Sequence, residues 1–248
     1  MQTHPSRLEA DNGFQMGRAA NAELLFNLTE TDRLVLSQTD EEFEAHDWEN
    51  LKKLIGEFIP CFDSALTLCR TLSKTLTYSL GANKLELLKR KPSDLRRYIQ
   101  WSASVRAEYG SVANYVLVNR LPKSWGQPPF TPASSTPFAD PSDYRVLIND
   151  WPYGLAPGIT HLVVWSRTLI PTDDGIGDLT PESRKLVADF VKRYFVERLG
   201  PGAEDRVLWF KNWASLQSVR SVDHVHVLVR DVGPEIIEEW TREQDCHK

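Results

Sequence analysis

The chain has 248 residues, of which 41% are hydrophobic and 25% charged, and its formal net charge is -5 at pH 7. This composition is typical of a packed globular core, and no apolar run approaches the roughly 20 residues that span a bilayer. The negative net charge argues against a protein that coats nucleic acid without sequence preference, although it permits a local basic surface. Cys61, Cys69 and Cys246 have no CxxC spacing, which argues against a disulfide framework and a zinc knuckle. We expect a soluble cytoplasmic protein without a membrane partner, a DNA partner or a cofactor.

Two segments of the N-terminal half differ from the rest in composition. Residues 1–22 are polar without a period, which predicts a disordered N-terminus. Residues 56–86 are poor in charge, rich in Ser, Thr and Leu, and contain two of the three cysteines. We interpret this second segment as a translated intron, because codons that resemble splice signals can be read at its two ends. A genuine helical insertion is the alternative.

The rest of residues 23–130 predicts helices. Thr29 or Thr31 can cap a first helix, since a hydroxyl before an amphipathic run is a helix-start signal. Thr39 with Glu42 forms a capping-box pattern for a second helix.

A break at Pro92 separates these helices from the next one. Ser93 can cap that helix, and Asp94 would lie in its first turn. Residues 111–121 predict a further helix.

The hydrophobic period becomes that of strands after a segment rich in Pro and Ser at 126–144. Apolar runs bounded by turn residues predict four strands, at 144–150, 159–167, 206–213 and 221–231. Thr180 as cap, Pro181 as first residue and Gly200 as stop mark a helix between the second and third strands, and a short helix follows at 233–244. One helix among four strands favours an antiparallel sheet with a helix on one face. The predicted fold class is therefore α+β, with a helical N-terminal part packed on a mainly antiparallel sheet formed by residues 131–248.

The last strand carries the most suggestive pair of side chains, His224 and His226. Alternation places these two and Leu228 on one face, whereas Asp223, Val225, Val227 and Val229 share the other. A neutral imidazole can act as a general base, a nucleophile or a metal ligand. We expect a half-buried sheet edge that turns both imidazoles toward a polar hollow. An exposed strand face with no chemistry is the alternative.

The order of parts in residues 143–231 resembles the histidine-triad fold. The strings that carry this resemblance are "PGITHLVVW", "DLTPESRKLV", Asn212, "QSV" at 217–219 and "HVHVLVR" at 224–230. The third histidine of the pattern would fall on Leu228 or Val222. The resemblance implies a sheet of similar shape and, as one possible function, nucleotide hydrolysis or transfer.

A second resemblance runs from about Leu28 to Trp240. The strings "HDWENLKKLI", "LLKRKPSDLRRY", "EYGSVANYVLVNRLPKSWGQPPFTP" and "WFKNWASLQSVRSVDHVHVLVRD" are similar to the fungal N-acetylglucosamine-induced protein family. Some relatives are synthases of arginine-containing cyclodipeptides, which join amino acids from aminoacyl-tRNAs into a diketopiperazine. The resemblance implies this activity, with arginyl-tRNA and a second aminoacyl-tRNA as partners. A protein of the N-acetylglucosamine response without catalytic activity is the alternative.

The resemblance directs attention to two groups of charged residues. The nearest match to an acidic D-D-x-x-E motif of the synthases is Asp40, Glu41 and Glu44, whose carboxylates could pair with a guanidinium. A basic cluster, which could contact tRNA phosphates, comprises Lys89, Arg90, Lys91, Arg96 and Arg97. The alternative for both groups is a solvated helix start with ion pairs inside the chain. Tyr98 and Trp101 nearby could stack on a base or fill the core.

Peptide-bond formation requires a base, an oxyanion donor and, for a covalent route, a nucleophile. We expect His224 or His226 as the base and Ser218, or alternatively Ser215, as the acyl acceptor. Asn212 and Gln217 are candidates for the oxyanion donors. For a metal, His224 and His226 would need Asp47 or His161 as a third ligand, and no such spacing is diagnostic, so we expect no metal.

Overall fold

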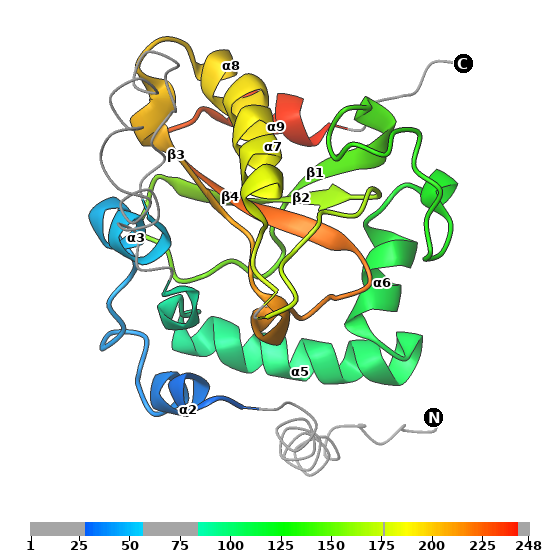
Figure 1. Ribbon diagram of the computed structural model, residues 1–248. Helices are drawn as coiled ribbons and strands as arrows, with labels where there is room; N and C mark the ends of the chain where they lie inside the picture. The colour runs from blue at the N-terminus through cyan, green and yellow to red at the C-terminus, as the bar shows by residue number, and fades with distance from the viewer. Residues whose placement is uncertain (1–27, 57–83, 176, 243–248) are drawn as a thin grey trace, which may run out of the picture.

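An antiparallel sheet forms the centre of the computed structural model, which describes residues 28–56, 84–175 and 177–242 (Figure 1). Its strands are β1 (Tyr144–Ile148), β2 (Ile159–Ser166), β3 (Val207–Phe210) and β4 (Asp223–Arg230). They lie in the order β1-β2-β4-β3, and each neighbouring pair is antiparallel. The predicted α+β class and the antiparallel sheet are confirmed. The expectation that the two-histidine strand lies at a sheet edge is wrong, because β4 is bonded on both sides.

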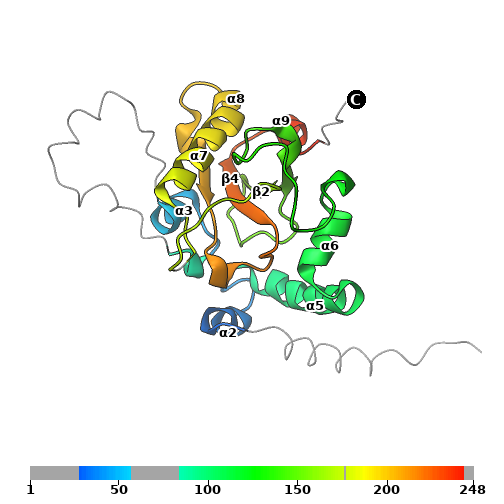
Figure 2. The same ribbon diagram turned by 45° about the vertical axis from the view of Figure 1, so that its right-hand side comes forward.

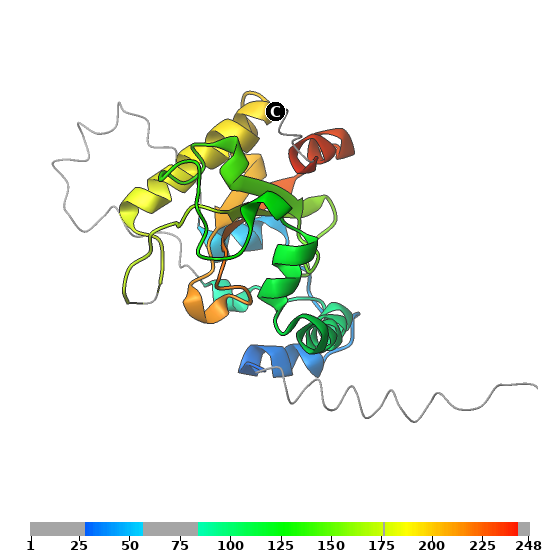
Figure 3. The ribbon, with the colours of Figure 1, turned by 90° about the vertical axis from the view of Figure 1, so that its right-hand side faces the viewer.

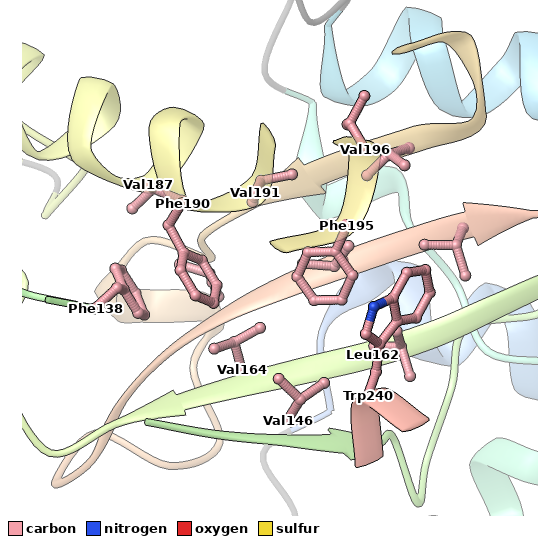
Figure 4. Close-up of a cluster of buried hydrophobic side chains, with 14 of the residues drawn as sticks. Phe138, Val146, Leu162, Val164, Val187, Phe190, Val191, Phe195, Val196 and Trp240 are labelled. Atoms are coloured by element: carbon pink, nitrogen blue, oxygen red, sulfur yellow. The ribbon is translucent and has the colours of Figure 1, made fainter. Parts of the chain in front are cut away.

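One face of the sheet is covered by α7 (Pro181–Val191) and α9 (Pro234–Thr241). In the view of Figure 3, the yellow α7 and the red α9 lie on the opposite side of the sheet from the green and teal helices. Figure 4 shows how Phe190 and Phe195 reach down toward the strand residues Val146 and Val164, with Trp240 of α9 beside them. The valines of β4 that were predicted to share a face, Val225, Val227 and Val229, belong to this same cluster and are fully buried.

Local sequence signals set the ends of α7. The Thr180 side chain accepts a hydrogen bond from the backbone N–H of Ser183, and Pro181 occupies the first helical position, as predicted. The helix continues through a π-helical turn at Lys192–Val196 into α8 (Glu197–Leu199). It ends at Gly200, whose φ of 90° is strained for residues with a Cβ.

The other face of the sheet, which carries the histidines, is covered by α3 (Trp48–Ile55), α5 (Pro92–Tyr109) and α6 (Val112–Asn119). Figure 2 shows α5 and α6 below the sheet, on the side away from α7 and α8. The short α2 (Glu30–Leu36) packs on α5 through Val35. The predicted helical N-terminal part thus shares its core with the sheet.

Two predicted helix starts are placed differently in the structure. Thr39 and Glu42 make both hydrogen bonds of a capping box, but they close a turn, and the next helix begins only after its cap Asp47. Ser93 is not the cap of α5, because Pro92 is already its first helical residue. Thr29 caps α2 with a complete capping box, as one of the two predicted options requires.

A buried ion pair fixes the loop rich in Pro and Ser between α6 and β1. Asp143 is fully buried, and its carboxylate accepts hydrogen bonds from the backbone N–H groups of Ala133 and Ser134. The Arg167 guanidinium at the end of β2 donates to the same carboxylate at 2.7 Å. The carboxylate therefore ties the loop to the sheet, and both of its oxygens accept hydrogen bonds inside the protein.

Several predictions fall outside the described residues. The disordered tail at 1–22, the three cysteines and most of the proposed intron are among them. The residues that flank this last segment are described, and the Lys84 backbone N–H donates to the Leu54 carbonyl at 2.9 Å. The chain therefore leaves and re-enters the fold at neighbouring points. Within the described ranges, no helix combines the length and apolar character needed to cross a membrane.

Candidate functional site

A pocket of about 140 Å³ lies between the histidine face of the sheet and the helices α5 and α6. We call it the central pocket. The sheet contributes Val163, Trp165, His224 and His226, and α5 contributes Tyr98 and Trp101. The loop after β1 and the loop after β3 close its remaining sides. The two predicted histidines therefore line a concavity, and the alternative of an exposed strand face is excluded, since His224 is 6% and His226 is 8% exposed.

His224 has one nitrogen that its neighbours leave available. Its Nδ1 lies 3.0 Å from the Val222 carbonyl, and because a carbonyl can only accept, Nδ1 must carry the proton. The neutral ring then has its lone pair on Nε2. The ring lies 4.6 Å from the Trp165 ring and lines the central pocket. This tautomer is the one that a base or a nucleophile requires at Nε2.

His226 is held between two side chains. Its Nδ1 lies 3.0 Å from His161 Nε2 on the adjacent strand, and its Nε2 lies 3.2 Å from the Asn212 amide nitrogen. The Phe210 ring stacks on it at 4.8 Å with an interplanar angle of 15°. Both of its nitrogens are thus engaged within the protein. Of the two histidines predicted as the base, the geometry favours His224.

Burial keeps the imidazoles of this site neutral. It lowers the pKa of His161 to about 3 and the pKa of His224 to about 4. Burial also lowers the pKa of His226 well below the ordinary value, and the neighbouring His161 and His224 act in the same direction. The Arg90 guanidinium adds to the lowering for His161 and His226. At neutral pH all three rings therefore present lone pairs rather than positive charge.

Ser218, the predicted acyl acceptor, lines the central pocket and receives a hydrogen bond from Tyr98. The Tyr98 hydroxyl donates to Ser218 Oγ at 3.0 Å. The Ser218 proton then remains available to another acceptor. Ser215, the alternative nucleophile, is exposed and does not line the central pocket.

The structure changes the role that the sequence predicted for Asn212 and Gln217. The side-chain amide nitrogen of Asn212 already lies near His226 and the Tyr153 hydroxyl. The side-chain amide nitrogen of Gln217 donates to the backbone carbonyl of Asn212 at 2.6 Å. Both N–H groups of the Asn212 amide thus have partners inside the protein, and Gln217 does not line the central pocket, so neither side chain is placed as an oxyanion donor. The buried Asn212 Oδ1, in contrast, has no partner in the described part of the chain. It can accept a hydrogen bond from a ligand.

The predicted basic cluster does not converge on one surface. Lys91 pairs with Asp40, Arg97 pairs with Asp94, and Arg96 donates to the Leu36 carbonyl. The Lys89 side chain does not line the central pocket, whereas Arg90 does, with its guanidinium carbon 4.3 Å from the Tyr98 ring centroid. Ion pairs and backbone contacts thus direct these cations to different neighbours, and their contact with tRNA phosphates stays a prediction.

The predicted acidic group also lies away from the central pocket. Asp40 accepts a hydrogen bond from the Ser93 backbone at the start of α5, and the Ser93 and Lys91 contacts hold its pKa at about 2. Glu41 and Glu44 are exposed on the preceding turn. Asp40 thus accepts from a backbone N–H in the first turn of α5, and Glu41 and Glu44 are solvated and do not lie at a helix start.

Other pocket residues were not predicted from the sequence. The segment after β1 contributes Asn149, Asp150 and Trp151, and α6 contributes Arg120, which pairs with Asp150 at 2.8 Å. Polar residues directly after an apolar strand were the available signal, since sites gather at strand ends and in loops. For the part of the chain that is described, no group of three or more His, Cys, Asp or Glu residues could hold a metal ion.

A family model described as "Protein of unknown function (DUF3605)" matches residues 74–230. The chain belongs to this family. The match begins inside the segment interpreted as an intron, and it includes every residue of the central pocket. The family description assigns no chemistry, so the function must be argued from the site.

Two fungal relatives support the same membership. N-acetylglucosamine-induced protein 1 of Candida albicans is 38% identical over 105 residues, which are 41% of this chain and 40% of that protein. An uncharacterized protein of Saccharomyces cerevisiae, YPL067C, is 31% identical over 118 residues, which are 47% of this chain and 58% of that protein. The resemblance to N-acetylglucosamine-induced proteins is confirmed. The matches span 40% and 58% of these relatives, so whole-protein activities remain proposals.

One solved structure has a related shape. It is described as the crystal structure of HTC1, with 23% sequence identity, a TM-score of 0.49, and coverage of 78% of this chain and 91% of that chain. The histidine-triad arrangement and cyclodipeptide synthesis both remain predictions.

Proposed function

We propose that the central pocket catalyses acyl transfer from aminoacyl-tRNA and that the protein is a tRNA-dependent cyclodipeptide synthase with arginine as one substrate. The observation that carries the acyl transfer is the hydroxyl pair of Tyr98 and Ser218 in a pocket that also holds the neutral base His224. The choice of aminoacyl-tRNA and arginine rests on the family resemblance.

In the first step, Ser218 Oγ attacks the ester carbonyl of the first aminoacyl-tRNA. The Ser218 proton passes to His224 Nε2 and from there to the departing ribose hydroxyl. The products are an aminoacyl ester on Ser218 and a deacylated tRNA. The Tyr98 hydroxyl donates a hydrogen bond of 3.0 Å to Ser218 Oγ. This bond stabilises the negative charge that develops on Ser218 Oγ as its proton leaves.

The second and third steps form the two amide bonds. The amine of the aminoacyl-Ser218 attacks the second aminoacyl-tRNA ester and releases the second ribose hydroxyl. The amine of the resulting dipeptidyl ester then attacks the Ser218 ester, closes the ring and restores the Ser218 hydroxyl. We assign Asn212, which lines the pocket and whose buried Oδ1 lacks a partner among the described residues, as an acceptor for an N–H of a substrate amine.

The test uses purified protein, tRNA charged with isotope-labelled arginine and a mixture of other aminoacyl-tRNAs. We expect a labelled diketopiperazine in the mass spectrum, and its loss in the Ser218→Ala and His224→Ala variants. Ser215→Ala is the matched control, because Ser215 lies in the same loop, is exposed and does not line the central pocket. A wild-type protein that forms no arginine-containing product would refute the synthase. Product formation by Ser218→Ala at the wild-type rate would refute its role as acyl acceptor.

A second function is favoured by the tautomer of His224. A neutral imidazole with a free Nε2 is also a nucleophile for phosphorus, and His161 brings a third imidazole next to His226 from the adjacent strand. This arrangement would suit nucleotide hydrolysis or transfer. Incubation with adenylated substrates tests it, with release of adenosine monophosphate and a transient adduct on His224 as the expected results. If neither function is observed, a protein without catalytic activity remains the alternative.

A further inference from the structure

Arg90 is a cation of the central pocket without a carboxylate partner in the described ranges. The other arginine of the pocket, Arg120, pairs with Asp150 at 2.8 Å. Toward the described residues, Arg90 donates a hydrogen bond through its Nε–H alone, to the Trp151 carbonyl at 3.3 Å. Its two terminal amino groups are left for another acceptor, in the planar fork that matches the oxygens of a phosphate or carboxylate.

The position of Arg90 is set by its neighbours on the chain and by two rings. The Lys89 backbone N–H donates to His46 Nε2 at 3.0 Å, and the Lys89 carbonyl accepts from the Gly154 N–H at 2.8 Å. The guanidinium carbon then lies 4.3 Å from the centroid of the Tyr98 ring and 5.6 Å from that of Tyr153. These contacts orient the guanidinium before any ligand arrives, which reduces the entropy lost on binding.

An aromatic wall stands beside this cation. Trp101 and Trp151 are half-buried, both line the central pocket, and their ring centroids lie 5.1 Å apart. The Tyr98 ring lies 5.8 Å from Trp101 and 5.5 Å from Trp151. An indole ring can stack on a nucleic-acid base, and a guanidinium group can hold a phosphate through charge-assisted hydrogen bonds. The central pocket has both groups side by side.

We propose that Arg90 is an anion-binding residue that holds the phosphate of a nucleotide whose base stacks on Trp101 or Trp151. A free mononucleotide and the 3′-terminal nucleotide of an RNA share this chemistry. Placing the tRNA end here rests on the proposed function, whereas phosphate binding by Arg90 does not. The test is therefore a binding measurement that needs no turnover.

The experiment compares adenosine monophosphate with adenosine by calorimetry and by quenching of tryptophan fluorescence. We expect Arg90→Gln to weaken adenosine monophosphate by about tenfold or more and to leave adenosine within about twofold, since only the nucleotide has the phosphate. Arg90→Lys keeps the charge but loses the fork, so an intermediate loss is expected. Arg96→Gln is the matched control, because Arg96 is an exposed arginine of α5 outside the pocket.

The second arm uses a short RNA that ends in CCA. An RNA end is the ligand if this RNA binds in a way that depends on Arg90 and adenosine monophosphate binds at least tenfold more weakly than the RNA. A free nucleotide is the ligand if adenosine monophosphate binds as tightly as the RNA or more tightly. Three results would overturn the proposal. The first is that neither adenosine monophosphate nor the RNA binds at millimolar concentration, and the second is that Arg90→Gln and Arg90→Lys leave the affinity unchanged. The third is that Arg90→Gln lowers the affinities for adenosine and for adenosine monophosphate equally. If Arg90→Gln fails to fold, Arg90→Lys carries the comparison.

Discussion

The hydroxyl of Tyr98, in the middle of α5, donates a hydrogen bond of 3.0 Å to the hydroxyl of Ser218, a residue 120 positions further along the chain. Tyr98 is buried, with 4% of its surface exposed, whereas Ser218 lies in the loop before β4. The bond brings a helix of the N-terminal part onto the loop that carries the predicted nucleophile. Ser218 is thereby oriented from outside its own loop.

The Tyr98→Phe variant tests this orientation. We expect kcat for diketopiperazine formation to decrease by about tenfold to a hundredfold, because a donor to the reacting oxygen is removed while the ring stays. The free energy of unfolding should decrease by only about 1 kcal/mol, the usual contribution of one hydrogen bond. Product formation by mass spectrometry and urea unfolding measure the two effects. An unchanged kcat would show that the bond is structural.

His224 and His226 should respond differently to substitution. His224→Ala removes the available Nε2, and we expect a loss of about a hundredfold or more in kcat with the Michaelis constant changed less. His226→Ala removes one hydrogen-bond partner each from the buried His161 and Asn212, so we expect a decrease of about 1–3 kcal/mol in the free energy of unfolding. Kinetics and urea unfolding of both variants check this. A larger kcat loss in a well-folded His226→Ala protein would reverse the assignment.

Acid should destabilise the fold from about pH 6.5 downward. An unfolded histidine has a pKa of 6.5, whereas burial lowers the pKa of folded His161 to about 3 and of folded His224 to about 4. Between these values the unfolded state binds more protons, so the free energy of unfolding falls as pH falls, by at most about 1.4 kcal/mol per pH unit for each group. Urea unfolding between about pH 7 and pH 5 measures the slope. His224→Asn should reduce the slope without removing it, since His161 remains, and a flat wild-type profile would contradict the neutral, buried state.

Asp143 should be among the residues most important for stability. Asp143→Ala leaves the nearly buried Arg167 guanidinium and two backbone N–H groups without their partner, and we expect a loss of about 3–5 kcal/mol. Asp189→Ala is the matched control, since its pair with Lys185 is exposed and should contribute less than about 0.5 kcal/mol. Chemical denaturation gives both values, and equal losses would be inconsistent with this account.

Removal of residues 57–83 with a short Gly-Ser link should preserve the fold. The Lys84 N–H donates to the Leu54 carbonyl at 2.9 Å, so the two flanking ends are already adjacent. A short link closes this gap with little loop-closure entropy. Circular dichroism and thermal unfolding of the shortened chain are the measurements, and a loss of cooperative unfolding would count against it. Sequencing of the mature transcript tests the intron interpretation itself.

The predictions that rest on local chemistry agree with the structure where the signal is complete. Thr29 and Thr180 each cap a helix through their own side chains, because a cap is made within one turn of chain. The turn at Thr39 shows the limit of this reasoning. Its two capping-box hydrogen bonds form, but no helix follows them. The chain continues instead to His46, which pairs with Leu155 in a β-bridge.

The neighbours of charged residues are harder to predict, for a different reason. Five cations within nine positions read as one surface in the sequence, but three of them precede α5 and two lie on it, and they reach different neighbours. Lys91 and Arg97 find carboxylates, and Arg90 turns toward the Tyr98 and Tyr153 rings. The partner of a long side chain depends on which segments fold against it, and the sequence near the charge does not specify those segments.

By itself, the sequence determined the class of the fold, the helix cap at Thr180 and the two faces of the histidine strand, because caps and hydrophobic periods act over a few residues. The tertiary structure alone decided that β4 is central, that His224 keeps a free Nε2 while His226 does not, and that Arg90 enters the pocket. Each of these depends on atoms that lie far apart in the chain and are brought within hydrogen-bond or packing distance only when the core closes.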